Sequence, residues 1–315
     1  MEFNTYILIW VCLFGLCFGS FYNVVILRSL SGESIVFPPS KCPKCNHKLS
    51  PWQNIPLLSF IILKGKCFYC REKISIQYPL VELITMVLFG ISFLKFGISI
   101  TTPFVILWLS CLLIITVTDI KEQIIDCNIA IIMMLSGLIY AYIIHGEILS
   151  SLLGLIAGFL GFKLIELVGK YFIKTDVMGE GDKYVAASLG AIFGIYNLII
   201  ILILGLFIYA ICFIPIFLYD KIKQNDIKTF ISFFVFLVSL ILFVLYCENY
   251  LLFMMIISAL IFTYFMIKGI NHNNLRQIPY VPAFSIGTLI FIFCFIQNFC
   301  YDKSLLVELI QKLIY

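Results

Sequence analysis

Charged residues are scarce in this sequence. Only 12% of its 315 residues are Asp, Glu, Lys or Arg, whereas 62% are hydrophobic. A soluble globular domain is about one quarter charged and about half apolar. The chain therefore has too little polar surface to cover a globule in water, which excludes an ordinary soluble protein. We expect a lipid bilayer to be the solvent for most of its length.

The first residues lack positive charge. Met1–Asn4 contains one acid and no Lys or Arg, and an apolar run then extends from about Tyr6 to Leu27. A secretory signal peptide has a basic start and a shorter apolar run. We therefore expect a retained membrane helix, with Arg28 marking its cytoplasmic end.

Apolar runs of membrane-spanning length recur through the rest of the chain. They predict an all-α polytopic membrane protein with about ten transmembrane helices. The stretch 183–219 has no charged residue after Lys183 and is too long for one span, so we divide it near Gly194–Asn197. The expected spans are 6–27, 78–97, 102–118, 127–145, 148–168, 183–197, 199–219, 229–247, 250–267 and 281–299.

Basic residues predict the orientation of these spans. With the N-terminus outside, 17 of the 21 Lys and Arg residues fall in segments on the cytoplasmic side. Treating 183–219 as one span would move Lys221, Lys223 and Lys228 to the outside. The positive-inside rule therefore favours ten spans, an N-terminus outside and localisation in the cell (inner) membrane.

The polar segments divide the chain into five parts. The segment 28–76 carries eight basic residues against two acids, and is too small to build much of a core unaided. We predict a first transmembrane helix at 1–27, a cytoplasmic zinc-ribbon loop at 28–76, a membrane core at 77–219, an additional helical hairpin at 220–277, and a last transmembrane helix with a C-terminal tail at 278–315.

Four of the twelve cysteines lie in the loop 28–76, in two CxxC pairs separated by 21 residues. This spacing is a strong signal for a closed tetrahedral zinc site. The segments 42–50 and 67–75 also form a weak repeat that shares both cysteines, a lysine and a serine. Two disulfides or four unlinked thiols are the alternatives, and a reducing cytoplasm disfavours the disulfides. The predicted ligands of a structural Zn²⁺ are Cys42, Cys45, Cys67 and Cys70.

Acids at a membrane edge are candidate functional groups. Asp119 ends the third expected span, and Asp182 begins the sixth within Gly179-Glu180-Gly181-Asp182. The topology places both at the cytoplasmic edge. Two carboxyl groups that share a proton can act as general base and general acid in peptide hydrolysis. The alternative for each acid is an ordinary helix-end charge among the lipid headgroups.

Several segments, in this order, resemble motifs of the type IV prepilin peptidase family, within the GxGD aspartyl proteases. Gly19–Ile26 is similar to the family's GSFLNVV signature, Gln77–Glu82 to its RYPLVE segment and Pro279–Phe284 to its PFGP segment. The double CxxC loop lies between the first two motifs. Asp119 and Asp182 match the two catalytic aspartates of the family, and several motifs in order are more specific than any one.

The resemblance covers most of 1–219 and again 278–300. This sequence departs from the family at two positions near the acids. Glu180 stands where the family usually has Met, and Ile125 stands where Pro is common before Asp126. Neither departure removes a catalytic group.

The resemblance implies an aspartic endopeptidase that removes the basic leader of type IV prepilins or pseudopilins at the cytoplasmic membrane face. It also implies N-methylation of the new N-terminal residue with S-adenosylmethionine. The residues that bind this cofactor are not indicated, because the chain has no glycine-rich nucleotide loop. The expected partners are these substrates, from pilus or secretion systems, and the lipid bilayer, with no nucleic acid.

Two other functions remain open. One is a GxGD protease for another membrane peptide, and the other is a transporter that uses intramembrane acids and a structural zinc. The acids of a transporter should lie near the middle of the bilayer, so acids at the edge favour a protease. Whether any peptide is cut distinguishes these functions most cheaply.

Overall fold

The computed structural model describes residues 2–146, 148–173, 179–223 and 280–295, together with positions 228, 231–235, 238, 239, 254, 257 and 261. The described elements are helices, and two isolated β-bridges lie in the loop after the first helix. Six helices are long and apolar enough to cross a membrane. The all-helical, multi-pass architecture is therefore confirmed. The expected spans 229–247 and 250–267 lie largely outside the described residues, so the count of ten stays a prediction.

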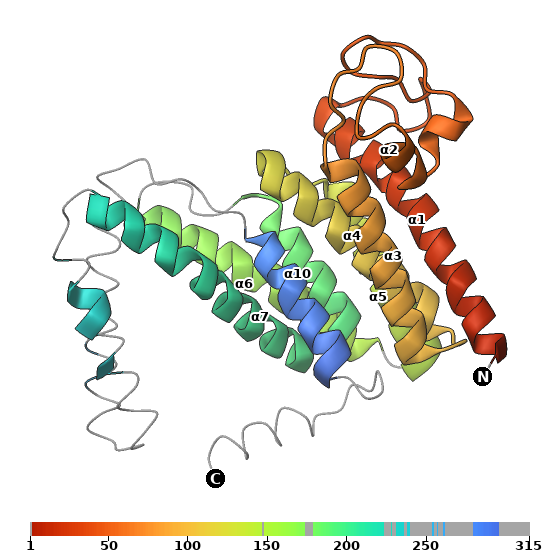
Figure 1. The fold of residues 1–315 in the computed structure, drawn as a ribbon. Helices are drawn as coiled ribbons and strands as arrows, with labels where there is room; N and C mark the ends of the chain where they lie inside the picture. Colours follow the sequence, from red (N-terminus) through yellow and green to blue (C-terminus); the bar gives the residue numbers. More distant parts are fainter. Residues whose placement is uncertain are drawn as a thin grey trace.

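From α3 to α7 the helices follow one another with short connections. Helix α1 packs on α3. Helices α5 and α6 both pack on α7, and α10 lies between α4 and α7 (Figure 1). The elements are α1 (Glu2–Ser31), η1 (Pro51–Asn54), α2 (Leu58–Ile62), α3 (Gln77–Phe96), α4 (Thr101–Glu122), α5 (Cys127–His145), α6 (Leu149–Ile173), α7 (Asp182–Lys223), α10 (Val281–Ile290) and the π-helical η2 (Phe291–Phe295).

Glycines set the close approach of α1 to α3. A Cβ on Gly15 would lie 2.8 Å from the Met86 Cα, and a Cβ on Gly19 would lie 2.6 Å from the Glu82 Cα. Lipid tails are as apolar as the helices, so small residues that admit backbone contact are what drive helices together. The buried side chain of Asn23 then donates a 3.1 Å hydrogen bond across the interface, to a carbonyl oxygen of α3. The first two motifs of the sequence thus lie against each other.

Helix α7 bends sharply at Gly194, whose φ of 73° and ψ of 174° are not helical. Tyr209, in the second half of α7, stacks on Tyr280 with ring centroids 4.5 Å apart, and Asp182 at the start of α7 acts electrostatically on both rings. The 28 residues from Asp182 to Tyr209 would extend about 40 Å as one straight helix. Asp182 and Tyr209 instead lie at the same edge of the bundle, so α7 turns back on itself. The turn is at Gly194, the first residue of the break expected at Gly194–Asn197.

The contact between α6 and the first half of α7 predicts a stability difference between two alanine variants. A Cβ on Gly154 would meet the backbone of Gly190, whereas a Cβ on Gly161, in the same helix, meets nothing within 4 Å. Gly154→Ala should therefore cost about 1–3 kcal/mol through overpacking. Gly161→Ala should be neutral or slightly stabilising, since Ala is the better helix former.

Thermal unfolding of the two variants in detergent measures this difference. Equal midpoints for Gly154→Ala and Gly161→Ala would show that the α6–α7 backbone contact is not as close as described.

Candidate active site and metal centre

Asp119 and Asp182 come together at one edge of the helix bundle. Both side chains are buried, with 5% and 6% of their surface exposed. The charge of Asp119 acts on the Asp182 carboxyl group, which places the two within electrostatic reach. The positions are 63 residues apart in the sequence, so the pairing is a product of helix packing.

Backbone amides hold each carboxyl group. The N–H of Val281, at the start of α10, donates a 3.1 Å hydrogen bond to Asp119 Oδ2. The N–H of Gly179 donates a 3.1 Å hydrogen bond to Asp182 Oδ2 from the turn before α7. Each acid thus has one oxygen fixed by a backbone donor. Fixed donors orient a carboxyl group for proton transfer without a second ionised side chain.

The turn before α7 approaches the chain between α4 and α5 very closely. A Cβ on Gly181 would meet the side chain of Ile125. Only glycine allows this approach, which explains the second glycine of the motif physically. Asp126, next in the chain, caps α5 by accepting a 2.9 Å hydrogen bond from the Asn128 N–H, and accepts a second, 3.3 Å bond from the Ser29 hydroxyl. Asp126 therefore has a structural role, as the cap of α5 and a partner of α1.

The stacked pair Tyr209 and Tyr280 is a part of the site that the sequence analysis did not single out as functional. Their ring planes are 21° apart, and both lie within electrostatic reach of Asp182. Tyr280 belongs to a motif that had been noted only for its resemblance. Tyr209 lies in an uninterrupted apolar run. Its phenol hydroxyl, which usually finds a polar partner when buried, is the one weak signal in the sequence that could have identified it.

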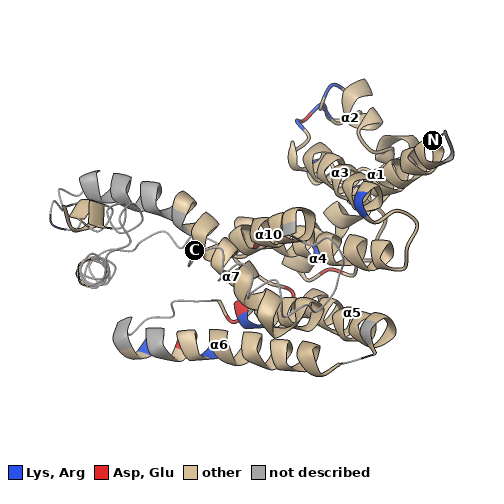
Figure 2. Ribbon diagram, turned by 90° about the horizontal axis from the view of Figure 1, so that it is seen from below, with Lys and Arg blue, Asp and Glu red and all other residues tan. Residues whose placement is uncertain are grey.

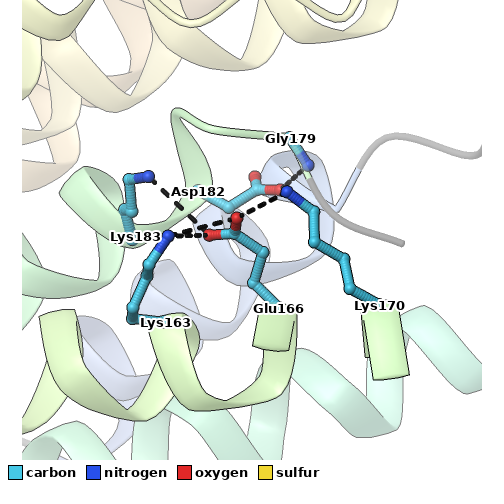
Figure 3. Close-up of polar contacts among 6 residues, drawn as sticks. All are labelled: Lys163, Glu166, Lys170, Gly179, Asp182 and Lys183. Atoms are coloured by element: carbon cyan, nitrogen blue, oxygen red, sulfur yellow. Dashed lines mark hydrogen bonds and ion pairs between the residues drawn. The ribbon is translucent and has the colours of Figure 1, made fainter. Parts of the chain in front are cut away.

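Lysines surround a single acid beside Asp182. Figure 3 shows Glu166 on α6 between Lys163 and Lys170, with Lys183 approaching from α7. The Nζ–carboxylate distances are 3.1 Å from Lys163, 3.1 Å from Lys170 and 3.7 Å from Lys183. Lys163 and Glu166 are spaced i, i+3 on α6, which places the two side chains on the same face of the helix. Lys183 follows Asp182 directly, so this contact also joins α6 to the start of α7.

Charged side chains are sparse over the rest of the described helices (Figure 2). The acids, the tyrosines and the lysine cluster therefore concentrate polar groups at one end of the α4–α6–α7–α10 group. The geometry can support proton transfer between two carboxyl groups at a membrane edge.

The four cysteines of the loop form a cluster that can hold a metal ion. The sulfur atoms of Cys42, Cys45, Cys67 and Cys70 all lie within 4.8 Å of one another. The Sγ atoms of Cys42 and Cys70 are 3.9 Å apart, close to the spacing of about 3.8 Å that two thiolates have on one tetrahedral Zn²⁺. None of the four is in a disulfide, and the Cys70 backbone lowers the pKa of the Cys67 thiol to about 7 by hydrogen bonding. The donor set and its spacing fit a zinc ion.

The two cysteine pairs have the same local structure. Asn46 N–H donates to the Cys42 carbonyl at 2.9 Å, and Arg71 N–H donates to the Cys67 carbonyl at 3.0 Å. Asn46 and Arg71 also share a positive φ, of 55° and 61°. A β-bridge closes each turn, between Lys41 and Lys48 in the first and between Lys66 and Lys73 in the second. The weak repeat in the sequence is thus a structural repeat.

Aromatic rings join the two cysteine turns. His47 of the first turn lies on Tyr69 of the second with ring centroids 3.5 Å apart, and Trp52 meets Phe68 edge-on at 5.6 Å. The imidazole is therefore part of the packing between the turns, and the group that could hold a metal ion consists of the four cysteines.

These features define a multi-pass helical membrane protein with paired buried acids at one edge and a cysteine cluster in the loop between its first two long helices. Two family models match this chain. The model described as the bacterial peptidase A24 N-terminal domain matches residues 13–96, and the model described as the type IV leader peptidase family matches residues 104–214. The first range contains the four cysteines and the second contains both acids.

Relatives named prepilin leader peptidase/N-methyltransferase are similar to more than half of the chain. The Myxococcus xanthus relative is 37% identical over 190 residues, which are 60% of this chain and 57% of that relative. The Neisseria gonorrhoeae relative is 35% identical over 208 residues, and the Bacillus subtilis relative is 37% identical over 185. Each of these two alignments covers 58% of this chain and 72% of the relative. No solved structure matches. The chain belongs to the type IV leader peptidase family.

The contact between Glu166 and its lysines predicts that Glu166→Ala lowers thermal stability. Removing the acid leaves three ammonium groups facing one another without a counter-charge. The midpoint of thermal unfolding in detergent should fall, and raising the salt concentration should recover part of the loss. The matched control is Glu122→Ala, which removes an exposed acid at the end of α4.

If Glu166→Ala and Glu122→Ala unfold at the same temperature, the lysine cluster does not stabilise the α6–α7 contact.

Proposed function

We propose that this protein is a membrane aspartic endopeptidase that removes the leader of type IV prepilins or pseudopilins and then methylates the new N-terminus. The observation that carries the proposal is the convergence of Asp119 and Asp182 at one edge of the bundle. Family membership supports the same activity, since several relatives are named prepilin leader peptidase/N-methyltransferase.

Asp119 and Asp182 are the catalytic residues in this proposal. One carboxylate takes a proton from a water molecule, whose oxygen attacks the scissile carbonyl carbon. The other, protonated carboxyl group donates its proton to the leaving amide nitrogen, and the C–N bond breaks. The products are a leader with a new carboxylate and a pilin with a new amino group. Two acids that share one proton supply both roles without a further cofactor.

The two acids lie at the same edge of the bundle as the start of the cysteine loop. The Ser29 hydroxyl, at the end of α1, donates to Asp126, so the loop that follows α1 begins beside the chain between α4 and α5. Eight basic residues lie in 28–76. By the positive-inside rule this edge is cytoplasmic, with the N-terminus outside, ten spans in all and the protein in the cell (inner) membrane.

Methyl transfer is the second activity in the proposal. The N-terminal family model covers the cysteine loop and α3, and the names of the relatives include N-methyltransferase. S-adenosylmethionine would supply the methyl group when it is bound. A structural Zn²⁺ on the four cysteines would fix the loop, because a closed tetrahedral site leaves no open position for chemistry.

Cleavage of a model prepilin tests the two acids. The substrate carries a basic leader that ends in Gly, followed by an apolar helix that begins with Phe. Wild type should cut it, and Asp119→Asn and Asp182→Asn should each lose about 10²-fold or more of the rate, since each removes one acid–base group. Mass spectrometry of the cut product with S-adenosylmethionine present also shows whether one methyl group is added.

Asp126→Asn is the matched control for these variants. Asparagine also caps helices well, so this variant should stay folded and nearly fully active. Near-normal cleavage by either Asp119→Asn or Asp182→Asn would remove the proposed pair, and loss of cleavage in Asp126→Asn would shift attention to that acid.

Metal content tests the cysteine cluster. Purified wild type should hold about one zinc ion per chain, and Cys67→Ser should lose most of it, because thiolate supplies one quarter of the ligand set. Cys17→Ser changes an exposed cysteine on α1, outside the cluster, and should leave the zinc content unchanged. Elemental analysis of the folded proteins makes the comparison. Full zinc content in Cys67→Ser would show that the metal lies elsewhere.

A further inference from the structure

The loop between α1 and α3 contacts the membrane helix α3 through one hydrogen bond. Its Leu57 N–H donates a 2.8 Å hydrogen bond to Glu82 Oε2. Glu82 is buried, and lies five residues beyond Gln77, where α3 begins. At a rise of about 1.5 Å per residue, this is about 7–8 Å below the start of α3 along its axis. The Glu82 side chain points back toward the N-terminus of α3, so the short helix α2, which begins at Leu58, starts at about the level of the first turns of α3.

One face of α2 is apolar and exposed. Leu58, Ile61 and Ile62 have 56%, 68% and 66% of their surface exposed. They are spaced i, i+3 and i+4, so they lie together on one side of the helix. Phe60 faces elsewhere, since its ring lies 3.1 Å from the position of a Cβ on Gly65. No described part of the chain covers the three aliphatic side chains.

The surroundings of this face match a lipid surface. Leu80 and Leu83 on α3 flank Glu82 in sequence, belong to a membrane-spanning helix, and are 51% and 44% exposed. The start of α2 therefore lies at about the level of α3 side chains that are exposed on a membrane-spanning helix. A soluble partner would have to meet α2 at the level of the first turns of a membrane-spanning helix.

Positive charge follows the apolar face directly. Lys64 and Lys66 come next in the chain after α2, and both are exposed. The segment 34–71 contains no acid at all. An aliphatic face followed by lysines is the pattern of a helix that lies in the membrane interface, with its ammonium groups among anionic headgroups.

We infer that α2 is an interfacial anchor, which inserts Leu58, Ile61 and Ile62 into the headgroup–acyl boundary of an anionic bilayer on the side of the bundle that holds the cysteine cluster. The anchor binds membrane lipid, separately from any peptidase or methyl-transfer step. Together with the Glu82 hydrogen bond it fixes the height of the loop over the membrane. The second cysteine pair begins at Cys67, five residues beyond Ile62, so the position of the cluster depends on this contact.

Photo-cross-linking to lipid tests the anchor in the full chain. The photoreactive residue p-benzoylphenylalanine replaces Ile62, Leu83 or Lys44 in three separate proteins, each reconstituted in nanodiscs of phosphatidylcholine and phosphatidylglycerol. Leu83 is the lipid-facing reference on α3, and Lys44 is the exposed reference in the first cysteine turn. Mass spectrometry after illumination counts lipid adducts at each position.

The expected result is that position 62 forms several-fold more lipid adducts than position 44, at a level near that of position 83. Nanodiscs of phosphatidylcholine alone should lower the yield at position 62 more than at position 83, because the lysines lose their anionic partners. Adducts at position 62 that are no more frequent than at position 44, while position 83 still forms them, would overturn the inference. So would adducts at position 62 that join it mainly to another protein chain.

Discussion

Helix α6 lies against α7 with their backbones in contact at Gly154 and Gly190, and the position of the site depends on this contact. In a bilayer the helices gain nothing by leaving lipid for one another, so packing must come from close van der Waals contact and from hydrogen bonds. Glycines supply that contact here. The same principle holds α1 against α3 at Gly15 and Gly19. Helix α7 starts at this edge with Asp182, and the bend at Gly194 brings its second half back to the same edge.

Burying two acids at that edge requires polar partners, and the chain supplies them from its backbone. The N–H groups of Val281 and Gly179 each hold one carboxyl group. Free backbone N–H groups occur at helix starts and in turns. This explains why α10 begins at the site and why the glycine motif forms a turn there. The lysines around Glu166 supply further charge and tie α6 to the residue after Asp182. The two acids are thus held by backbone donors from two different segments.

The cysteine loop solves a different problem. A segment of about fifty residues cannot bury enough apolar surface to fold by itself. Two turns of matching structure bring four thiol groups together, aromatic rings join the turns, and Glu82 holds the loop from within α3. Each of these contacts is local or nearly so, which explains why the spacing of the cysteines alone was enough to predict the cluster.

Local pattern therefore determined much of this protein. Hydropathy predicted the helical, multi-pass fold, because the length of an apolar run is a property of consecutive residues. The paired CxxC spacing predicted the cysteine cluster, and the motifs predicted the family. The sequence also predicted that Asp119 and Asp182 lie at the same membrane edge and could act as a pair. Only the tertiary structure showed the backbone donors that hold these acids, placed Tyr209 and Tyr280 beside Asp182, and set the start of α2 against Glu82 of α3. Most of those contacts join residues far apart in the chain, and helix packing, which no local pattern encodes, decides which of them meet.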